Sequence, residues 1–398
     1  MGIYGITNRN RATTSASDDA PEPRITRVIP DSVGLDSHDL ERIAPLVERY
    51  VERGVIPGAV VAIVRDDKLA YLEAFGSRSE GVPMTTDTHF DVASLTKPVV
   101  VATSVMQHVE RGELRLSERV DRLMPGFEGW RDHEGELHDV TLLDIMTHTS
   151  MLPPYVSLER LTMEYPDSAI LSRDLLMDYI AHCDREITDT EGASRYSCLN
   201  YITLGAIVEH VAKMPLDDYA RINIFEPLGM CDTRFTPDGE YAAMCAPTST
   251  SLCGVAHDPL AREIMNGVSG NAGLFSTAED LAIFSAMLLN GGLWRDAEIL
   301  SPLAVETLFR IPHGYEASNR TPGWKVARTM HAAAGDLLVG DDTLIHTGAT
   351  GTSITISKSH NLAIIILTNR TLGSATATDI HDLRSKVCNI VASAVNFL

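Results

Sequence analysis

The sequence predicts an α+β fold in which strands from both ends of the chain form one antiparallel sheet around a long helical middle. Residues 58–65 and 68–75 form two apolar runs joined by a pair of aspartates, a pattern typical of a hairpin. Strand patterns return near the C-terminus at residues 352–356 and 362–368, whereas the segment between shows helical spacing. These observations predict a discontinuous architecture in which the middle of the chain is a helical insertion.

Helices are expected on both flanks of the sheet. In residues 36–53 the apolar positions Leu40, Ile43 and Leu46 recur at helical spacing, and Gly54 provides a stop. After the hairpin, residues 90–94 lead into a second helix that runs to about residue 112.

The middle of the chain carries helical patterns separated by loops that contain proline and glycine, at residues 142–147, 172–183, 201–213 and 278–289. A final helix is expected over 375–396. The predicted parts are therefore a flexible tail over 1–30, an α/β part over 31–112 and 311–398, and a mainly helical part over 113–310.

Composition excludes several classes of function. The 54 acidic and 33 basic residues give a formal net charge of −21, which repels nucleic acid and anionic lipid. No apolar run is long enough to span a bilayer, and the N-terminus lacks the apolar core of a secretory signal, so we expect a soluble, cytoplasmic protein. The six cysteines show no Cys-x-x-Cys spacing, so we expect reduced thiols and no metal.

Ser94-Leu95-Thr96-Lys97 is the first candidate for chemistry. Residues three apart share a helix face, so the Ser94 hydroxyl and the Lys97 amine can meet. A lysine whose pKa is lowered by burial can activate a serine, and the apolar run after Lys97 suggests burial. A lysine that extends along an ordinary helix to solvent explains the local pattern equally well.

Two further segments add polar groups. Tyr196 stands where a loop enters an apolar helix, and beside a cation its oxygen can carry a proton, although a tyrosine packed on the helix start is the simpler explanation. His346-Thr347-Gly348-Ala349 precedes a strand, and its glycine would let a substrate approach the strand edge, although a tight turn alone also accounts for it.

In the order Ser-x-x-Lys, Tyr-Ser-Cys and His-Thr-Gly, the chain resembles the penicillin-recognising serine hydrolases from about residue 38 onward. It is most similar to the branch with class C β-lactamases, D-Ala-D-Ala carboxypeptidases, D-aminopeptidases and esterases. Residues 140–150 and 267–281 also resemble helical-domain segments of that branch. The resemblance implies a β-lactamase-like fold.

By position, the resemblance makes Ser94 the nucleophile, Lys97 its partner and Tyr196 the proton carrier. It places the oxyanion hole at the backbone amides of Ser94 and Ala349. The resemblance implies substrate contacts from a further set, namely Cys198, Asn200, His346, Thr347 and Gly348.

Two departures from the β-lactamase pattern affect the expected substrate. Cys198 stands where asparagine holds a substrate amide, although Asn200 lies close by, and His346 stands where lysine holds the β-lactam carboxylate. A histidine is charged only part of the time near neutrality. Both changes favour an esterase or a D-amino-acid peptidase over an efficient β-lactamase.

The resulting hypothesis is a serine hydrolase that forms an acyl-enzyme with a small ester, an amide or a D-amino-acid peptide, with no metal or organic cofactor. Two alternatives stay open, a transacylase of the same fold and a penicillin-binding-like sensing module without turnover. The sequence does not indicate an oligomeric state.

Overall fold

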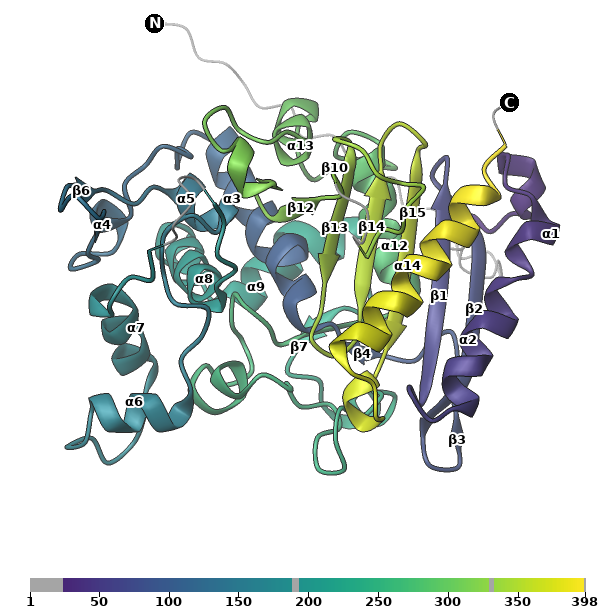
Figure 1. Cartoon of the computed structure of the whole chain (residues 1–398), viewed down its shortest axis with the longest axis horizontal. Coiled ribbons are helices and arrows are strands. Elements are labelled where there is room, and N and C mark those ends of the chain that lie inside the picture. Colours follow the sequence, from purple (N-terminus) through teal and green to yellow (C-terminus); the bar gives the residue numbers. More distant parts are fainter. Residues whose placement is uncertain (1–23, 188–192, 329–332, 397–398) are drawn as a thin grey trace, which may run out of the picture.

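An eight-stranded antiparallel sheet forms the centre of the protein, in a computed structural model that describes residues 24–187, 193–328 and 333–396 (Figure 1). Its strands, in sheet order, are β11 (Arg320–Thr321), β12 (Trp324–Val326), β13 (Thr343–Thr347), β14 (Ser353–Ser357), β15 (Leu362–Thr368), β1 (Gly58–Arg65), β2 (Lys68–Ser79) and β3 (Val82–Pro83). Strand β1 pairs with β15 so that Val61 lies opposite Ile366. The predicted joining of the two ends of the chain in one sheet is therefore confirmed.

Both faces of the sheet are covered. Side chains alternate along β1, so that Val61 and Ile63 enter the core on one face while Val60 and Ala62 enter the core on the other. The helices of the first face are α1 (Ser37–Leu40), α2 (Ile43–Glu52) and α14 (Ala377–Ser393), and α12 (Ala278–Leu289) packs on the second face, behind the sheet in Figure 1. Helix α12 has the predicted bounds, but it lies against the sheet and not within a separate helical part.

The helix predicted over residues 36–53 is interrupted. Helix α1 ends at Leu40, and α2 begins at Ile43 after a turn. Pro45 explains the break, because proline has no N–H for the carbonyl of Glu41 and its ring would clash with that carbonyl in a continuous helix.

The helical part lies beside the sheet, on the left in Figure 1. Its helices, with those that connect it to the sheet, are α3 (Thr103–Glu110), α4 (Val120–Leu123), α5 (Leu142–Thr147), α6 (Leu158–Glu164), α7 (Arg173–His182), α8 (Cys198–Ala212), α9 (Leu216–Ala220), α10 (Glu226–Leu228), α11 (Gly239–Ala243) and α13 (Pro302–Phe309). A small sheet of β4 (Phe90–Asp91), β8 (Leu274–Ser276) and β7 (Arg234–Phe235) ties this part to the segment that precedes Ser94.

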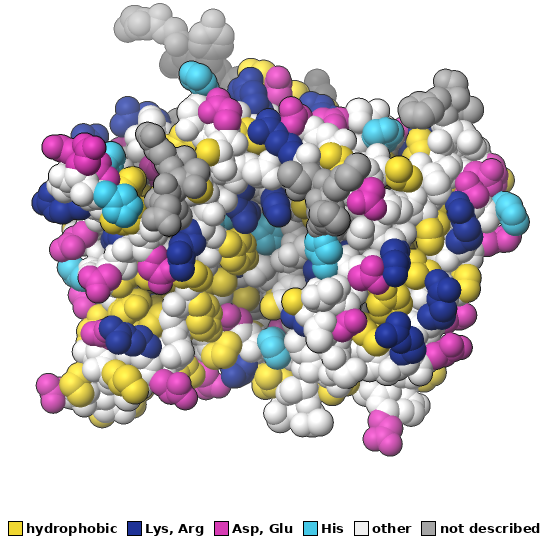
Figure 2. Space-filling view, in the orientation of Figure 1, with side chains coloured by type: hydrophobic (Ala, Val, Ile, Leu, Met, Phe, Trp, Pro, Cys, Tyr) yellow, Lys and Arg dark blue, Asp and Glu magenta, His cyan; other side chains and the backbone are white. Residues whose placement is uncertain are grey.

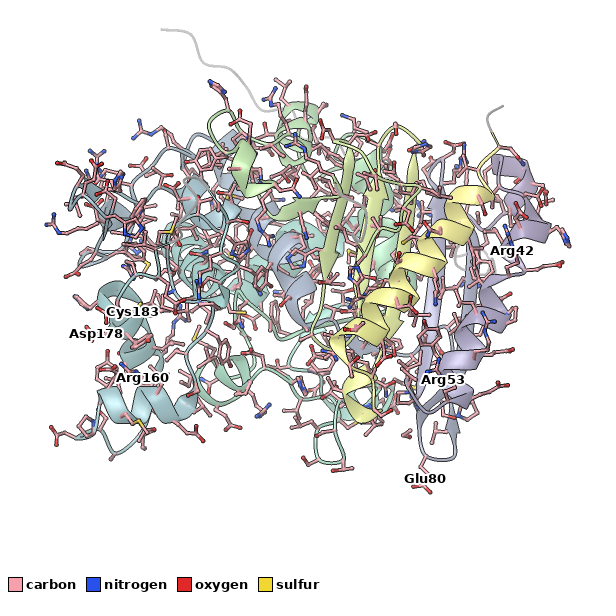
Figure 3. The ribbon with its side chains drawn as sticks, viewed as in Figure 1. Arg42, Arg53, Glu80, Arg160, Asp178 and Cys183 are labelled. Atoms are coloured by element: carbon pink, nitrogen blue, oxygen red, sulfur yellow. The ribbon has the colours of Figure 1, made fainter. Side chains whose placement is uncertain are left out.

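Charged side chains lie on the outside of these layers. Arg42 and Glu80, labelled in Figure 3, point away from the ribbon into solvent. Among the described residues, no helix combines the length and the apolar character needed to cross a membrane. All six cysteines are free thiols.

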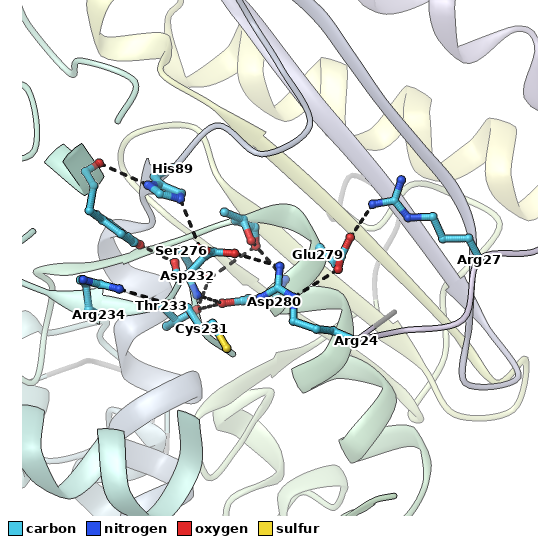
Figure 4. Close-up of polar contacts among 12 residues, drawn as sticks. Arg24, Arg27, His89, Cys231, Asp232, Thr233, Arg234, Ser276, Glu279 and Asp280 are labelled. Carbon is cyan, nitrogen blue, oxygen red and sulfur yellow. Dashed lines mark hydrogen bonds and ion pairs between the residues drawn. The ribbon is translucent and has the colours of Figure 1, made fainter. Parts of the chain in front are cut away.

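Residues 24–30 do not behave as the tail predicted over 1–30, of which residues 1–23 lie outside the described residues. Ile25 is 1% exposed, and Arg27 bridges to Leu69 of β2. Arg24 reaches Asp280 of α12, with 2.5 Å between Nη1 and Oδ1, and also pairs with Asp232 (Figure 4). Residues 24–27 are therefore fixed to α12 and β2.

Replacing Arg24 by alanine is expected to destabilise the fold more at pH 7.5 than at pH 5. Burial raises the pKa of Asp280 to about 6 although Arg24 opposes the shift, so the folded carboxyl is protonated at pH 5 and needs no cation. Its ionisation costs stability as the pH rises through 6, and without Arg24 that cost grows. Solvent screens the partly exposed Arg24, so we expect a loss of about 2 kcal/mol at pH 7.5, measured by urea unfolding.

The matched control is Arg27→Ala. Arg27 is mostly exposed and pairs with Glu279, so its loss should change the free energy of unfolding by roughly 0.5 kcal/mol or less at either pH. Equal losses for Arg24→Ala at pH 5 and pH 7.5 would contradict the role assigned to the Asp280 carboxylate.

Candidate active site

The turn that carries Ser94 is not a regular α-helix. Strand β4 is followed by a 3₁₀ turn, η2 (Ala93–Leu95), then by a π-helical segment, η3 (Lys97–Ala102), and only then by α3. The predicted single helix from Ser94 to about residue 112 is therefore divided into three. Pro98 lacks the N–H that a regular α-helical turn would use here, and π-helical turns are frequent at functional sites.

A buried carboxylate supports the conformation before Ser94. Ala93 has a φ of 48°, in the left-handed region that a side chain disfavours. Oδ1 of Asp91 accepts the Ala93 N–H at 2.8 Å, and Oδ2 accepts the His257 N–H at 2.7 Å. Burial raises the pKa of Asp91 to about 6, although both backbone N–H groups favour the carboxylate. Strained backbone of this kind occurs often at active sites.

Lys97 is fully buried and contacts Ser94. Its Nζ lies 3.0 Å from Ser94 Oγ, 2.8 Å from the carbonyl oxygen of Asn271 and 3.6 Å from Cys198 Sγ. Burial opposes its charge, but Cys198 and Tyr196 favour it, and the pKa of Lys97 is raised. Three acceptors suit the three N–H bonds of an ammonium. The sequence left open whether burial lowers the pKa of Lys97; here Cys198 and Tyr196 outweigh burial.

The side chain of Tyr196 lies beside Lys97. Its ring centroid is 5.0 Å from Lys97 Nζ and 4.6 Å from the ring centroid of His148, and Arg320 lies over the ring at 5.4 Å. His148 Nδ1 is 3.1 Å from the backbone nitrogen of Ser197, so the residue after Tyr196 is fixed as well. Tyr196 and Ser94 line one cavity. The structure thus brings Ser94, Lys97 and Tyr196 together.

The cavity has a volume of about 460 Å³ and lies between Ser94, the end of β13 and α14. Ile345, His346, Thr347, Gly348 and Ala349 line its sheet side. Figure 2 shows the molecule hollowed at the centre of this face, with Lys, Arg and His side chains around the hollow. Four residues predicted for the site, from His346 to Ala349, therefore face the same space as Ser94.

His346 is not a partly charged residue here. It is 5% exposed, and burial together with Lys97 and Arg320 lowers its pKa well below the ordinary value. Its imidazole is therefore neutral near pH 7. Its Nδ1 has no hydrogen-bond partner among the described residues.

Cys198 and Asn200 have different surroundings although both were expected to contact substrate. Cys198 is partly exposed and contacts Lys97, whereas Asn200 is fully buried. The Asn200 amide accepts from Ser150 Oγ at 2.5 Å and lies 3.1 Å from His148 Nδ1. Residues two apart on a helix point in nearly opposite directions, so α8 cannot present both side chains to the cavity. The structure does not bring Asn200 into the site.

Gly348 is required by the protein's own backbone. A Cβ at this position would lie 2.6 Å from the carbonyl oxygen of Val92 and 2.1 Å from Thr352 Oγ1. The expectation was that this glycine leaves room for a substrate. The structure shows that it lets the turn after β13 pack against the segment that precedes Ser94.

Sequence reasoning missed the cationic wall of the cavity, formed by Arg320, Lys325, Arg370 and Arg384. None of these four residues forms an ion pair with a carboxylate in the part of the chain that the structure describes. Their spacing in sequence carries no pattern, because they come from β11, β12, the segment after β15 and α14. Within the same described part, no three His, Cys, Asp or Glu side chains are grouped to hold a metal ion.

Comparison with known proteins bears on the family and the fold. A family model described as Beta-lactamase matches residues 43–387. A curated relative from Salmonella enteritidis, described as a putative D-alanyl-D-alanine carboxypeptidase, is 28% identical and aligns over 87% of this chain and 86% of its own length.

Solved structures share the fold. EstCE1, described as a hydrolase with promiscuous acyltransferase activity, has a TM-score of 0.70 at 22% identity and covers 89% of this chain and 99% of its own. Simvastatin synthase from Aspergillus terreus, in a mutant form, has a TM-score of 0.66 at 22% identity and covers 89% of this chain and 95% of its own. A class C β-lactamase has a TM-score of 0.68 at 18% identity and covers 91% of this chain and 98% of its own. The predicted β-lactamase-like fold is confirmed.

Proposed function

The chain belongs to the β-lactamase family of serine hydrolases, and on this basis we propose that it hydrolyses a small ester or amide through an acyl-enzyme on Ser94. The observation that carries the proposal is the 3.0 Å hydrogen bond from Lys97 Nζ to Ser94 Oγ at the wall of a 460 Å³ cavity. A buried ammonium beside a serine oxygen favours the deprotonated, nucleophilic form of that oxygen, and the cavity leaves room for a substrate.

In the proposed mechanism, Ser94 Oγ attacks the substrate carbonyl carbon and gives its proton to the Tyr196 oxygen, which acts as the base in its deprotonated form. Lys97, an ammonium with three acceptors around it, stabilises the negative charge on the Tyr196 oxygen before the transfer and on the Ser94 oxygen as it attacks. The carbonyl oxygen becomes an oxyanion that accepts from the backbone amides of Ser94 and Ala349. The tetrahedral intermediate collapses, and Tyr196 returns the proton to the leaving group. Water then attacks the acyl carbonyl carbon and gives its proton to the Tyr196 oxygen, and the acid leaves as Tyr196 returns that proton to Ser94 Oγ.

The substrate class follows from two positions. His346 is neutral, so it supplies no permanent cation at the place where β-lactamases carry lysine. Cys198 contacts Lys97 and offers no amide to a substrate side chain. We therefore propose esters or D-amino-acid peptides as substrates, and the name of the Salmonella relative supports the peptides. β-Lactams are expected to acylate Ser94 but to turn over slowly.

Covalent labelling tests the proposal. Incubation with a fluorophosphonate or a fluorescent penicillin should add one label per chain, located to Ser94 by peptide mass spectrometry, and Ser94→Ala should not be labelled. A parallel screen of short-chain p-nitrophenyl esters, nitrocefin and D-amino-acid peptides identifies the substrate. Labelling of Ser94→Ala at the wild-type level would refute the assignment of the nucleophile.

The same assay separates the alternatives. A transacylase would give an ester product when an alcohol competes with water, and a sensing module would show a burst of acylation without steady turnover. Steady release of the free acid with no ester product is the result expected for a hydrolase.

A further inference from the structure

The two amides proposed for the oxyanion hole come from segments about 250 residues apart in sequence, yet threonine hydroxyls join these segments directly. Thr350 Oγ1 donates to the carbonyl oxygen of Asp91 at 2.7 Å, and Thr352 Oγ1 donates to that of Val92 at 3.0 Å. Both threonine side chains are buried. The turn over residues 348–352 is thus tied to the two residues that precede Ala93 and Ser94.

A buried arginine holds the same turn from its other side. Arg384 of α14 donates through Nη2 to the carbonyl oxygens of Gly348, at 3.1 Å, and Thr352, at 2.8 Å. Arg384 is 7% exposed, and burial together with nearby Arg370 lowers its pKa to about 9, so it is still charged at neutral pH. A buried cation that lacks a carboxylate partner is costly to keep. Hydrogen bonds from a charged donor are roughly twice as strong as neutral ones. Here they hold the turn at its first and last residues, Gly348 and Thr352.

The turn over residues 348–352 packs closely against the segment that precedes Ser94. Gly348 lies so close to Val92 and Thr352 that no Cβ fits, and the Gly348 N–H donates to the Thr352 carbonyl at 2.7 Å. Arg370 Nε donates to the Ala349 carbonyl oxygen at 2.7 Å, which fixes the peptide that follows the Ala349 amide. The orientation of the Ala349 N–H is therefore determined by its neighbours and not by residue 349 itself.

We propose that Thr350, Thr352 and Arg384 are positioning residues that hold the Ala349 amide at a fixed distance from the Ser94 amide and so set the oxyanion hole. The inference rests on the proposed function. None of the three residues is assigned to donate to the substrate oxyanion. Each acts through the backbone that carries a donor, so its loss should weaken transition-state binding while substrate binding is kept.

Steady-state kinetics with p-nitrophenyl acetate tests the proposal on the full chain. Arg384→Met keeps the length of the side chain but removes its donors, and should lower kcat by about 100-fold, the scale of a lost oxyanion donor, with KM within about threefold. Thr350→Val and Thr352→Val remove one hydroxyl each and should lower kcat by about tenfold. Arg384→Lys should recover part of the loss, because it retains a charged donor.

The matched control is Thr343→Val. Thr343 is a buried threonine on β13 whose hydroxyl donates to Ser357 Oγ at 3.2 Å and takes no part in the turn. Its kcat should match the wild type, whereas a loss like that of Thr350→Val would overturn the proposal by showing that any buried hydroxyl on this sheet has the same effect. Thermal unfolding of each variant identifies any that fails to fold, and Thr352→Val replaces Arg384→Met in that case.

A second readout separates positioning from a general structural effect. An alkyl boronic acid forms a tetrahedral anion on a serine, so its affinity should fall by the same factor as kcat/KM in each variant. Added guanidinium should restore kcat in Arg384→Ala. Wild-type kcat in the Arg384 and threonine variants, or unchanged boronate affinity, would overturn this inference but not the proposed function. A wild-type chain that no serine reagent labels would overturn the proposed function instead.

Discussion

Replacement of Ser94 by alanine is expected to lower kcat/KM for p-nitrophenyl acetate by about 10⁵-fold. The loss is large because Lys97 and Tyr196 act on the Ser94 oxygen, and without it they have no group to activate. A residual rate above that in water should remain, because the oxyanion donors and the cavity still bind the substrate. The rate is measured with enzyme freed of wild-type contamination by titration with a fluorophosphonate.

Ser104→Ala provides the control for this variant. Ser104 is a buried serine on α3, ten residues further along the chain, and its hydroxyl donates to the Val100 carbonyl at 2.8 Å. It does not line the cavity, so the kcat/KM of Ser104→Ala should stay within about twofold of the wild type. More than about one hundredth of the wild-type rate in Ser94→Ala would mean that another group is the nucleophile.

The parts of the site that local spacing determines could be predicted from the sequence. Ser94 and Lys97 meet because residues three apart share a face of a helix. The predicted contact is present even though the segment forms a 3₁₀ turn followed by a π-helix and not a regular α-helix. The hairpin of β1 and β2 and the strand β15 were equally predictable. Each strand is either a continuous apolar run or an alternation of apolar and polar residues, and turn residues bound it at both ends. Tyr196 was placed by family resemblance, since its own surroundings in sequence fit a simple helix start.

The parts that tertiary packing determines could not be predicted. Arg384 reaches the turn after β13 only because α14 crosses the sheet at that point, and nothing in its own sequence indicates a buried arginine. Strands β11 and β12 are two and three residues long around a Pro-Gly turn, too short for a pattern to be visible. The charge of Lys97 depends on Cys198 and Tyr196, which lie about a hundred residues away in sequence.

Replacement of Lys97 by methionine is expected to lower kcat by about 10³-fold with little change in KM. Methionine fills a similar volume but leaves Ser94 Oγ and the Asn271 carbonyl without a donor. Lys97→Arg should be nearly as impaired, because a planar guanidinium cannot reach three acceptors that are arranged around a single nitrogen. Lys358→Met, which removes an exposed lysine distant from these contacts, should retain wild-type kcat.

The pH dependence of kcat/KM decides which form of Lys97 works. The pKa of Lys97 is raised above its ordinary value of 10.5, so the ammonium persists throughout the neutral and mildly alkaline range and only higher pH removes it. Lys97 should therefore cause no inflection between pH 6 and pH 9, and any inflection in that range should remain in Lys97→Arg. If instead an inflection near neutrality disappears in Lys97→Arg, the lysine works as a neutral base, and Tyr196 is not needed as the proton acceptor.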